Sequence, residues 1–313
     1  MYLKDNNSII ETRKTIRKRS KIKQAFTYIL ALLGGQFLGG MFIGLVFADM
    51  VSFSGNLTEV NLTVGNLMEK YSDKFMVFSL FGTTIATLVM YMFARIYQKR
   101  NKASLGLTGE NRVRNYLIGA LVGSAMLALV VIINVLIGHM SLSNNIGNVS
   151  FGVFALFIIG WVLQGFSEEF MCRAVLMNWL AAEKGVIFGI VVNALLFSLL
   201  HFGNSGFALL PAINLFLVGL LYSLMFYISD DIFLVGAAHS FWNFVQGNVF
   251  GVQVSGNSYL ENTIWKSQMN GQTIMNGGAF GIEGGLVCTV INLVAIIICI
   301  KIIWDRKLLV KNK

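Results

Sequence analysis

A short charged stretch inside an apolar run carries the side chains most suited to chemistry. Glu168, Glu169 and Arg173 fall within the hydrophobic run 151–182. Each charge costs about 2.5–3.5 kcal/mol at the centre of a bilayer, so charges kept there indicate a functional site. Glu169 and Arg173 are four residues apart, share a helix face and can pair. Glu168 points about 100° away from that face. The alternative is an ion pair that only locks helix packing.

Two further polar positions fall inside apolar runs, His201 and the pair His239-x-x-x-Asn243. Glu168 lies 17 residues before Gly185, and His201 lies 16 residues after it. If these two runs form a hairpin at Gly185, both side chains lie about 24–26 Å from the turn. We therefore expect Glu168 to contact His201. By the same count His239 is only about 10 Å from the start of its own run, which is shallower than Glu168 and His201. Asn243 lies nearer to their depth.

These residue types suit the hydrolysis of an amide bond. A carboxylate in a pocket of low dielectric can deprotonate water. Glu168 is the candidate base, and His201 would help to hold the water. Attack of water on a peptide carbonyl creates an oxyanion, which needs fixed hydrogen-bond donors. His239 and Asn243 can each donate, so the set predicts a peptidase without a covalent nucleophile.

Two other chemistries remain open for the same residues. Two histidines and a carboxylate suit zinc with one open position, so Glu168, His201 and His239 are the expected ligands if a metal is present. No His-Glu-x-x-His occurs, and we favour a site without metal or other cofactor. Ser167 and Cys172 are possible nucleophiles, but neither is next to a histidine in the sequence.

The composition predicts a membrane protein. The 313 residues are 56% hydrophobic and 12% charged, and the mean hydropathy is +0.69, whereas soluble domains carry about 25% charged residues. We predict an all-α polytopic membrane helix bundle with about eight spans. The expected spans are approximately 25–47, 75–96, 116–137, 151–182, 186–202, 207–228, 232–250 and 284–304.

The segments around these spans define the domain organisation. We expect a basic N-terminal segment at 1–24, three spans with their loops at 25–137, a catalytic core at 151–304 that includes an outer loop at 251–283, and a basic tail at 305–313.

The distribution of basic residues predicts the topology. Of the 24 lysines and arginines, only Lys70, Lys74 and Lys266 fall in outer loops, and Arg173 lies within a span. The positive-inside rule then predicts a cytoplasmic location for both termini. It also explains the net charge of +9 without a nucleic-acid partner.

Small residues are spaced for close helix contacts. Glycines four apart on one face let two helices approach closely. Three such pairs occur in the predicted spans, and they are Gly35 with Gly39, Gly40 with Gly44, and Gly119 with Gly123.

The order of the polar motifs resembles that of a known family. The sequence is similar, over about residues 151–250, to the CPBP (Abi) family of intramembrane proteases, relatives of the type II CAAX prenyl endopeptidase. The motifs that carry the resemblance are Glu168-Glu169-x-x-x-Arg173, Phe197-x-x-x-His201 and His239-x-x-x-Asn243. More loosely, residues 242–247 and 277–285 look like a bacterial branch of the family.

The resemblance implies a role for each motif. Glu168 would be the general base, with His201 as its partner in positioning water. His239 and Asn243 would form the oxyanion hole. The last two motif residues, Glu169 and Arg173, would be structural supports. The family has been described as metalloproteases, yet the resemblance favours a glutamate-type mechanism.

The sequence thus predicts a multi-pass peptidase of the cell membrane that cleaves a membrane-associated protein or peptide. Prenylated CAAX substrates are implied by distant relatives alone, and peptide processing or bacteriocin immunity are further possible roles. The rival hypothesis is a non-catalytic scaffold, or a bacteriocin self-immunity protein, that binds a sensor or peptide partner. A transporter with a proton relay is disfavoured because no inverted repeat is evident. The sequence does not fix the oligomeric state.

Overall fold

The computed structural model describes the chain except for residues 1, 17–19, 54–71, 258–259 and 311–313. The side chains of residues 47, 49–53 and 310 are likewise not described. Several basic residues used for the topology prediction therefore lie outside the described residues, and they are Arg17, Lys18, Arg19, Lys70, Lys311 and Lys313.

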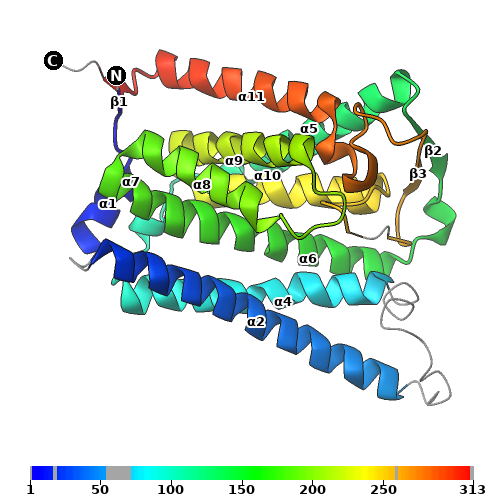
Figure 1. Cartoon of the computed structure of the whole chain (residues 1–313), viewed down its shortest axis with the longest axis horizontal. Helices are drawn as coiled ribbons and strands as arrows, with labels where there is room; N and C mark the ends of the chain where they lie inside the picture. Colours follow the sequence, from blue (N-terminus) through cyan, green and yellow to red (C-terminus); the bar gives the residue numbers. More distant parts are fainter. Residues whose placement is uncertain (1, 17–19, 54–71, 258–259, 311–313) are drawn as a thin grey trace.

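The described chain is a bundle of helices that follow the predicted spans closely (Figure 1). The α-helices are α1 (Asn7–Thr15), α2 (Lys21–Phe53), α4 (Ser72–Met92), α5 (Arg112–Leu136), α6 (Phe151–Glu169), α7 (Asn178–Lys184), α8 (Val186–Leu200), α9 (Leu209–Ser229), α10 (Ile232–Phe244) and α11 (Leu286–Asp305). Three of them continue as π-helices, and these segments are Phe93–Tyr97 after α4, Phe170–Met177 after α6 and Val245–Val249 after α10.

Length and composition mark most of these helices as membrane spans. Within the described ranges, six helical runs are long and apolar enough to cross a bilayer, and they contain α2, α4, α5, α6, α9 and α11. The run with α6 is 34 residues long and ends with α7, and α8 is a shorter apolar helix. The predicted polytopic all-α membrane bundle is confirmed. The count of eight spans stays a prediction, since α8 and α10 are shorter than the other six.

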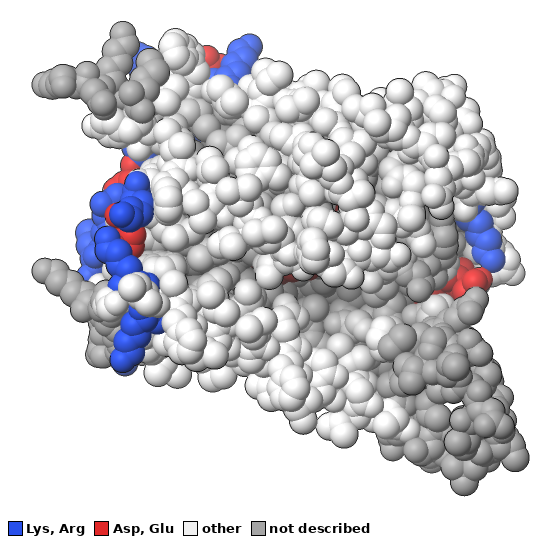
Figure 2. All heavy atoms as spheres, viewed as in Figure 1, with Lys and Arg blue, Asp and Glu red and all other residues white. Residues whose placement is uncertain are grey.

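The first and last strands of the described chain lie together at one end of the bundle. β1 (Tyr2–Leu3) pairs antiparallel with β4 (Leu309–Val310), at the end where β1 is labelled in Figure 1. Lysine and arginine side chains gather at this same end, and a broad uncharged band separates them from the few charges at the opposite end (Figure 2). This arrangement fits an even number of spans and the predicted charge asymmetry.

Two segments predicted as loops contain strands. β2 (Met140–Asn144) and β3 (Trp265–Met269) form an antiparallel pair, which covers the end of the bundle opposite the termini (Figure 1). Their positions fall within 138–150 and the outer loop 251–283. Sequence alternation is weak in both strands because most of their side chains face out.

The basic N-terminal segment also holds an unexpected helix. α1 packs against the core, with Ile9 fully buried. The anchor is Arg100, a fully buried guanidinium that donates to Thr12 Oγ1 at 3.0 Å and to the carbonyls of Val175 and Ala174 at 2.9 and 2.7 Å. One side chain therefore ties α1 to the π-helix that follows α6.

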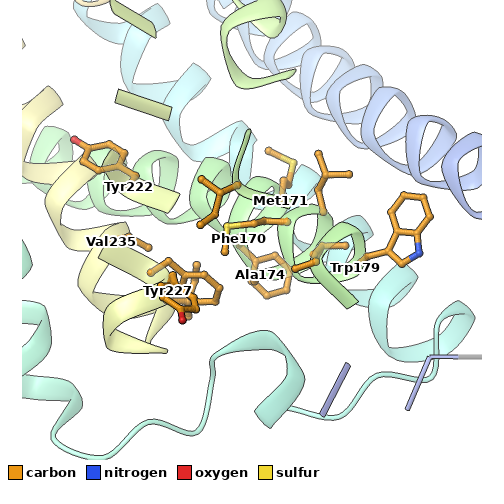
Figure 3. Close-up of a cluster of buried hydrophobic side chains, with 14 of the residues drawn as sticks. Phe170, Met171, Ala174, Trp179, Tyr222, Tyr227 and Val235 are labelled. Atoms are coloured by element: carbon orange, nitrogen blue, oxygen red, sulfur yellow. The ribbon is translucent and has the colours of Figure 1, made fainter. Parts of the chain in front are cut away.

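That π-helix, Phe170–Met177, is entirely buried. Phe170, Met171 and Ala174 lie in the main hydrophobic core with Tyr222 of α9 and Val235 of α10 (Figure 3). Short π-helical segments occur frequently at functional sites. Here the segment follows directly after Glu168 and Glu169 and contains Arg173.

Glycines set the closest helix contacts. A Cβ atom on Gly119 or Gly123 of α5 would lie 2.0 Å from a backbone oxygen of α10. A Cβ on Gly35 of α2 would lie 2.9 Å from Ala86 Cα of α4. Gly40 and Gly44 meet nothing within 4 Å. The pair on α5 and the first pair on α2 thus pack as predicted, and the second pair on α2 does not.

We predict that Gly123→Ala destabilises the protein, because the new methyl group overlaps the carbonyl of Ala238, next to His239. Such overpacking costs about 1–3 kcal/mol. Thermal unfolding in detergent micelles measures the effect. Gly40→Ala is the matched control, since its methyl group enters open space. Equal melting temperatures for the two variants would contradict the tight α5–α10 contact.

Candidate active site

A fully buried carboxylate holds the centre of the site. Glu169 Oε1 accepts a hydrogen bond from Arg173 Nη1 at 3.0 Å, and His239 Nδ1 lies 2.8 Å from the same oxygen. The Glu169 and Arg173 side chains have no solvent exposure. Arg173 also donates to the carbonyl of Gly219 on α9 at 3.2 Å, and its guanidinium lies 4.5 Å from the ring centre of Phe197 on α8. The predicted ion pair is present, and it joins four helices.

The same carboxylate fixes the orientation of His239. A carboxylate only accepts hydrogen bonds, so His239 Nδ1 carries a proton and donates it to Glu169. The other ring nitrogen, Nε2, faces Glu168 and lies 3.9 Å from its Oε2. A hydrogen bond of this kind determines which ring nitrogen is free for chemistry, and here it is Nε2.

Glu168 differs from its neighbour in exposure and in partners. Its side chain is 26% exposed, whereas that of Glu169 is fully buried. Gln164 Nε2, one turn earlier on α6, donates to Glu168 Oε1 at 2.6 Å. Among the described residues, Glu168 Oε2 makes no hydrogen bond. The two adjacent carboxylates thus differ in their surroundings: Glu169 is fully buried and bonded through Oε1, and Glu168 has an unbonded oxygen in a partly exposed position.

All four predicted catalytic residues line one cavity of about 390 Å³. They are Glu168, His201, His239 and Asn243. The other walls come from α2 and α4, which contribute mostly apolar side chains such as Leu32, Met76 and Leu80. The space-filling view shows this face hollowed between α2 and α8, with acidic atoms visible inside (Figure 2).

The expected contact between Glu168 and His201 is not formed. In the described chain these two side chains share no hydrogen bond or ion pair, although both line the cavity. His201 caps the C-terminus of α8, which ends at Leu200. Its Nδ1 lies 2.9 Å from the carbonyl oxygen of Phe197, so the ring is drawn back towards its own helix. Equal distance from the turn at Gly185 places the residues at one level without bringing them together.

The predicted shallow position of His239 is wrong. His239 reaches both Glu168 and Glu169. The reason is that α10 starts deeper than α7 does: Ile232 at its first position is fully buried, and α7 extends towards the terminal end of the bundle beyond the start of α10 (Figure 1). The turns before α8 and α10 therefore lie at different depths, so residue counts from the two turns do not give comparable depths.

Two residues of the site were missed by the sequence reasoning. Gln164 bonds Glu168 and also accepts from Asn243 Nδ2 at 2.9 Å. Its spacing of four from Glu168 is a signal that could have found it. Glu283, from the outer loop, accepts from Trp242 Nε1 at 3.1 Å and lines a smaller cavity of about 30 Å³ beside the histidines. Glu283 falls in the stretch 277–285 that loosely resembles the family, but that resemblance gave it no role.

The alternative nucleophiles have no activating partner. Ser167 is fully buried and donates to the carbonyl of Thr83 at 3.1 Å. Cys172 lines the cavity, but no histidine bonds it within the described ranges. The donor types at the site suit zinc, yet no three histidine, cysteine, aspartate or glutamate side chains of the described chain are placed to hold one ion.

Comparison with protein families finds a match over the segment that contains the site. Residues 150–245 match the family model described as Type II CAAX prenyl endopeptidase Rce1-like. The matched segment runs from α6 to α10 and contains every predicted site residue. Over this segment the chain is similar to the type II CAAX prenyl endopeptidases, which supports the resemblance to the CPBP family. Comparison with curated proteins and with solved structures finds no match.

We predict that Glu169→Gln lowers the free energy of unfolding by about 3–5 kcal/mol, because it leaves the buried Arg173 charge without compensation. Titration with SDS measures this loss. The matched control is Glu261→Gln. Glu261 pairs with Lys266, and their side chains are 74% and 51% exposed, respectively. Such a surface ion pair contributes about 0–1 kcal/mol. A loss as small as that of the control would show that the buried pair is not a stabilising centre.

Proposed function

We propose that this protein is an intramembrane endopeptidase of the cell membrane, in which Glu168 activates water for attack on a peptide bond. The observation that carries the proposal is the free Oε2 of Glu168 in the cavity that also contains His201, His239 and Asn243. The family match over the same residues supports a protease.

In the proposed reaction, Glu168 Oε2 removes a proton from a water molecule held with His201. The water oxygen bonds to the carbonyl carbon, and the carbonyl oxygen becomes an oxyanion. Asn243 Nδ2 and His239 Nε2 donate to that oxyanion, as a fixed oxyanion hole requires. Glu168 then gives the proton to the leaving nitrogen, and the C–N bond breaks. One water is consumed, and a carboxylic acid and an amine are released.

The role of His239 depends on its protonation. Since Nδ1–H is directed at Glu169, Nε2 donates to the oxyanion only when both ring nitrogens carry protons. The buried Glu169 carboxylate lies 2.8 Å away and balances that charge. The contact that orients the ring therefore also supports its function as a donor.

The apolar walls of the cavity support a membrane-associated peptide as the substrate. Leu32, Met76, Leu80 and Val254 line it together with the polar site, so a hydrophobic peptide segment fits better than a soluble polar one. The smaller cavity of about 30 Å³ is large enough for water, and it supplies polar groups beside His201 for the hydrolytic water.

The central test compares membrane-protein termini in cells that carry the wild type or Glu168→Gln. We predict that at least one new terminus present with the wild type is absent with the variant, because the amide cannot remove a proton from water. Mass spectrometry of labelled termini measures this. If all termini are unchanged while a cellular phenotype of the wild type persists in the variant, the protein acts as a scaffold or immunity protein instead.

The proposed reaction needs no metal. We predict that the purified protein keeps its activity after dialysis against a zinc chelator, with a zinc metallopeptidase as the control for effective chelation. The measurement is cleavage of a peptide that spans a terminus mapped in the cells. Loss of activity that added Zn²⁺ restores would assign Glu168, His201 and His239 to metal binding.

A further inference from the structure

One glutamine connects the two halves of the site. Gln164 Nε2 donates to Glu168 Oε1 at 2.6 Å, and Gln164 Oε1 accepts from Asn243 Nδ2 at 2.9 Å. We propose that Gln164 is a positioning residue, an inference that rests on the proposed function. Gln164 holds the general base Glu168 on α6 and the oxyanion donor Asn243 on α10 in one fixed geometry.

The chemistry of the bridge requires an amide. A carboxylate accepts only, so the group next to Glu168 must donate. The group next to Asn243 Nδ2 must accept. A glutamine amide provides a donor and an acceptor on one planar group, in the order that these two partners need. The bond to Glu168 is short, as expected when the acceptor is charged.

The bridge stands next to a close backbone approach of α6 and α10. A Cβ on Gly165 would lie 2.5 Å from the backbone nitrogen of Ser240, and Ser240 Oγ donates to the carbonyl of Val162 at 3.3 Å. One turn away, Trp161 Nε1 donates to Asn248 Oδ1 at 2.7 Å. These contacts keep the backbones of α6 and α10 in place, so Gln164 acts on side-chain orientation rather than on helix spacing.

The bridge also selects which oxygen of Glu168 reacts. Oε1 is occupied by Gln164, so Oε2 is the oxygen left to accept a proton from water. That oxygen faces His239 Nε2 at 3.9 Å, a gap that one water can link. Without Gln164 the carboxylate is free to rotate, and Asn243 loses the partner that directs its amide.

The test uses Gln164→Met, which keeps the side-chain length and removes both the donor and the acceptor. The substrate is an internally quenched peptide that spans a mapped cleavage site, cleaved by the purified full-length protein. We expect kcat to fall about 10- to 100-fold with little change in KM, because misplacement of catalytic groups by about 1 Å costs about that much. Gln268→Met, on exposed β3 outside the cavity, is the matched control and keeps the wild-type kcat.

A second variant separates positioning from packing. In Gln164→Glu, the new carboxyl donates and accepts as the amide does when it is protonated, and it only accepts when it is ionised. The ratio of its kcat to that of the wild type therefore rises as the pH falls, whereas the ratio for Gln164→Met stays low throughout. The titratable groups that line the cavity with Gln164 are Glu168, Cys172, His201 and His239, and the Glu169–Arg173 pair lies behind His239.

The outcomes distinguish this proposal from the proposed function. If Glu168→Gln keeps its activity, the proposed function is wrong. If Glu168→Gln is inactive while Gln164→Met keeps the wild-type kcat, or changes KM alone, the positioning role is wrong. A ratio for Gln164→Glu that does not change with pH would also overturn it, because a packing role alone does not depend on the donor.

Discussion

The structure depends on one buried carboxylate oxygen. Glu169 Oε1 binds Arg173 and His239 together, in a region without solvent exposure. A buried ion pair is a poor source of stability by itself, because desolvation of both ions offsets their attraction. Here the pair has further partners: Arg173 donates to α9 and stacks on α8, and His239 comes from α10. Glu169 therefore joins these helices at one point, and Glu168 remains available for the proposed reaction.

Close backbone contacts make that arrangement possible. Without a hydrophobic driving force between spans, helices in a bilayer associate through tight packing and hydrogen bonds. Glycines of α5 and α6 bring both helices against the backbone of α10, so the helix that carries His239 and Asn243 is held on two sides. Arg100 donates a hydrogen bond to a backbone carbonyl of the π-helix after α6, and it also anchors α1. The polar site is thus surrounded by closely packed helices.

The fold was largely predictable because a membrane span is set by local apolar length, and the helices begin and end near the predicted bounds. The Glu169–Arg173 pair was also predictable, since its spacing fixes it within one helix. What failed depended on how elements start relative to one another: His239 is deep because α10 starts deep, and His201 turns back because α8 ends at Leu200. The helix α1 has a local start signal in its N-cap Asn6, which accepts from Ile9 N–H, but its anchor Arg100 is distant in sequence.

The most direct measurement is diffraction at the zinc absorption edge from crystals grown in lipid, at a resolution that shows ordered water. The account predicts a water molecule within hydrogen-bond distance of Glu168 Oε2, on the side of the cavity that His201 lines, without anomalous signal. It also predicts that His239 Nδ1 stays on Glu169. An anomalous peak at that position, or a cavity without water beside Glu168, would contradict the central claim that this carboxylate activates water directly.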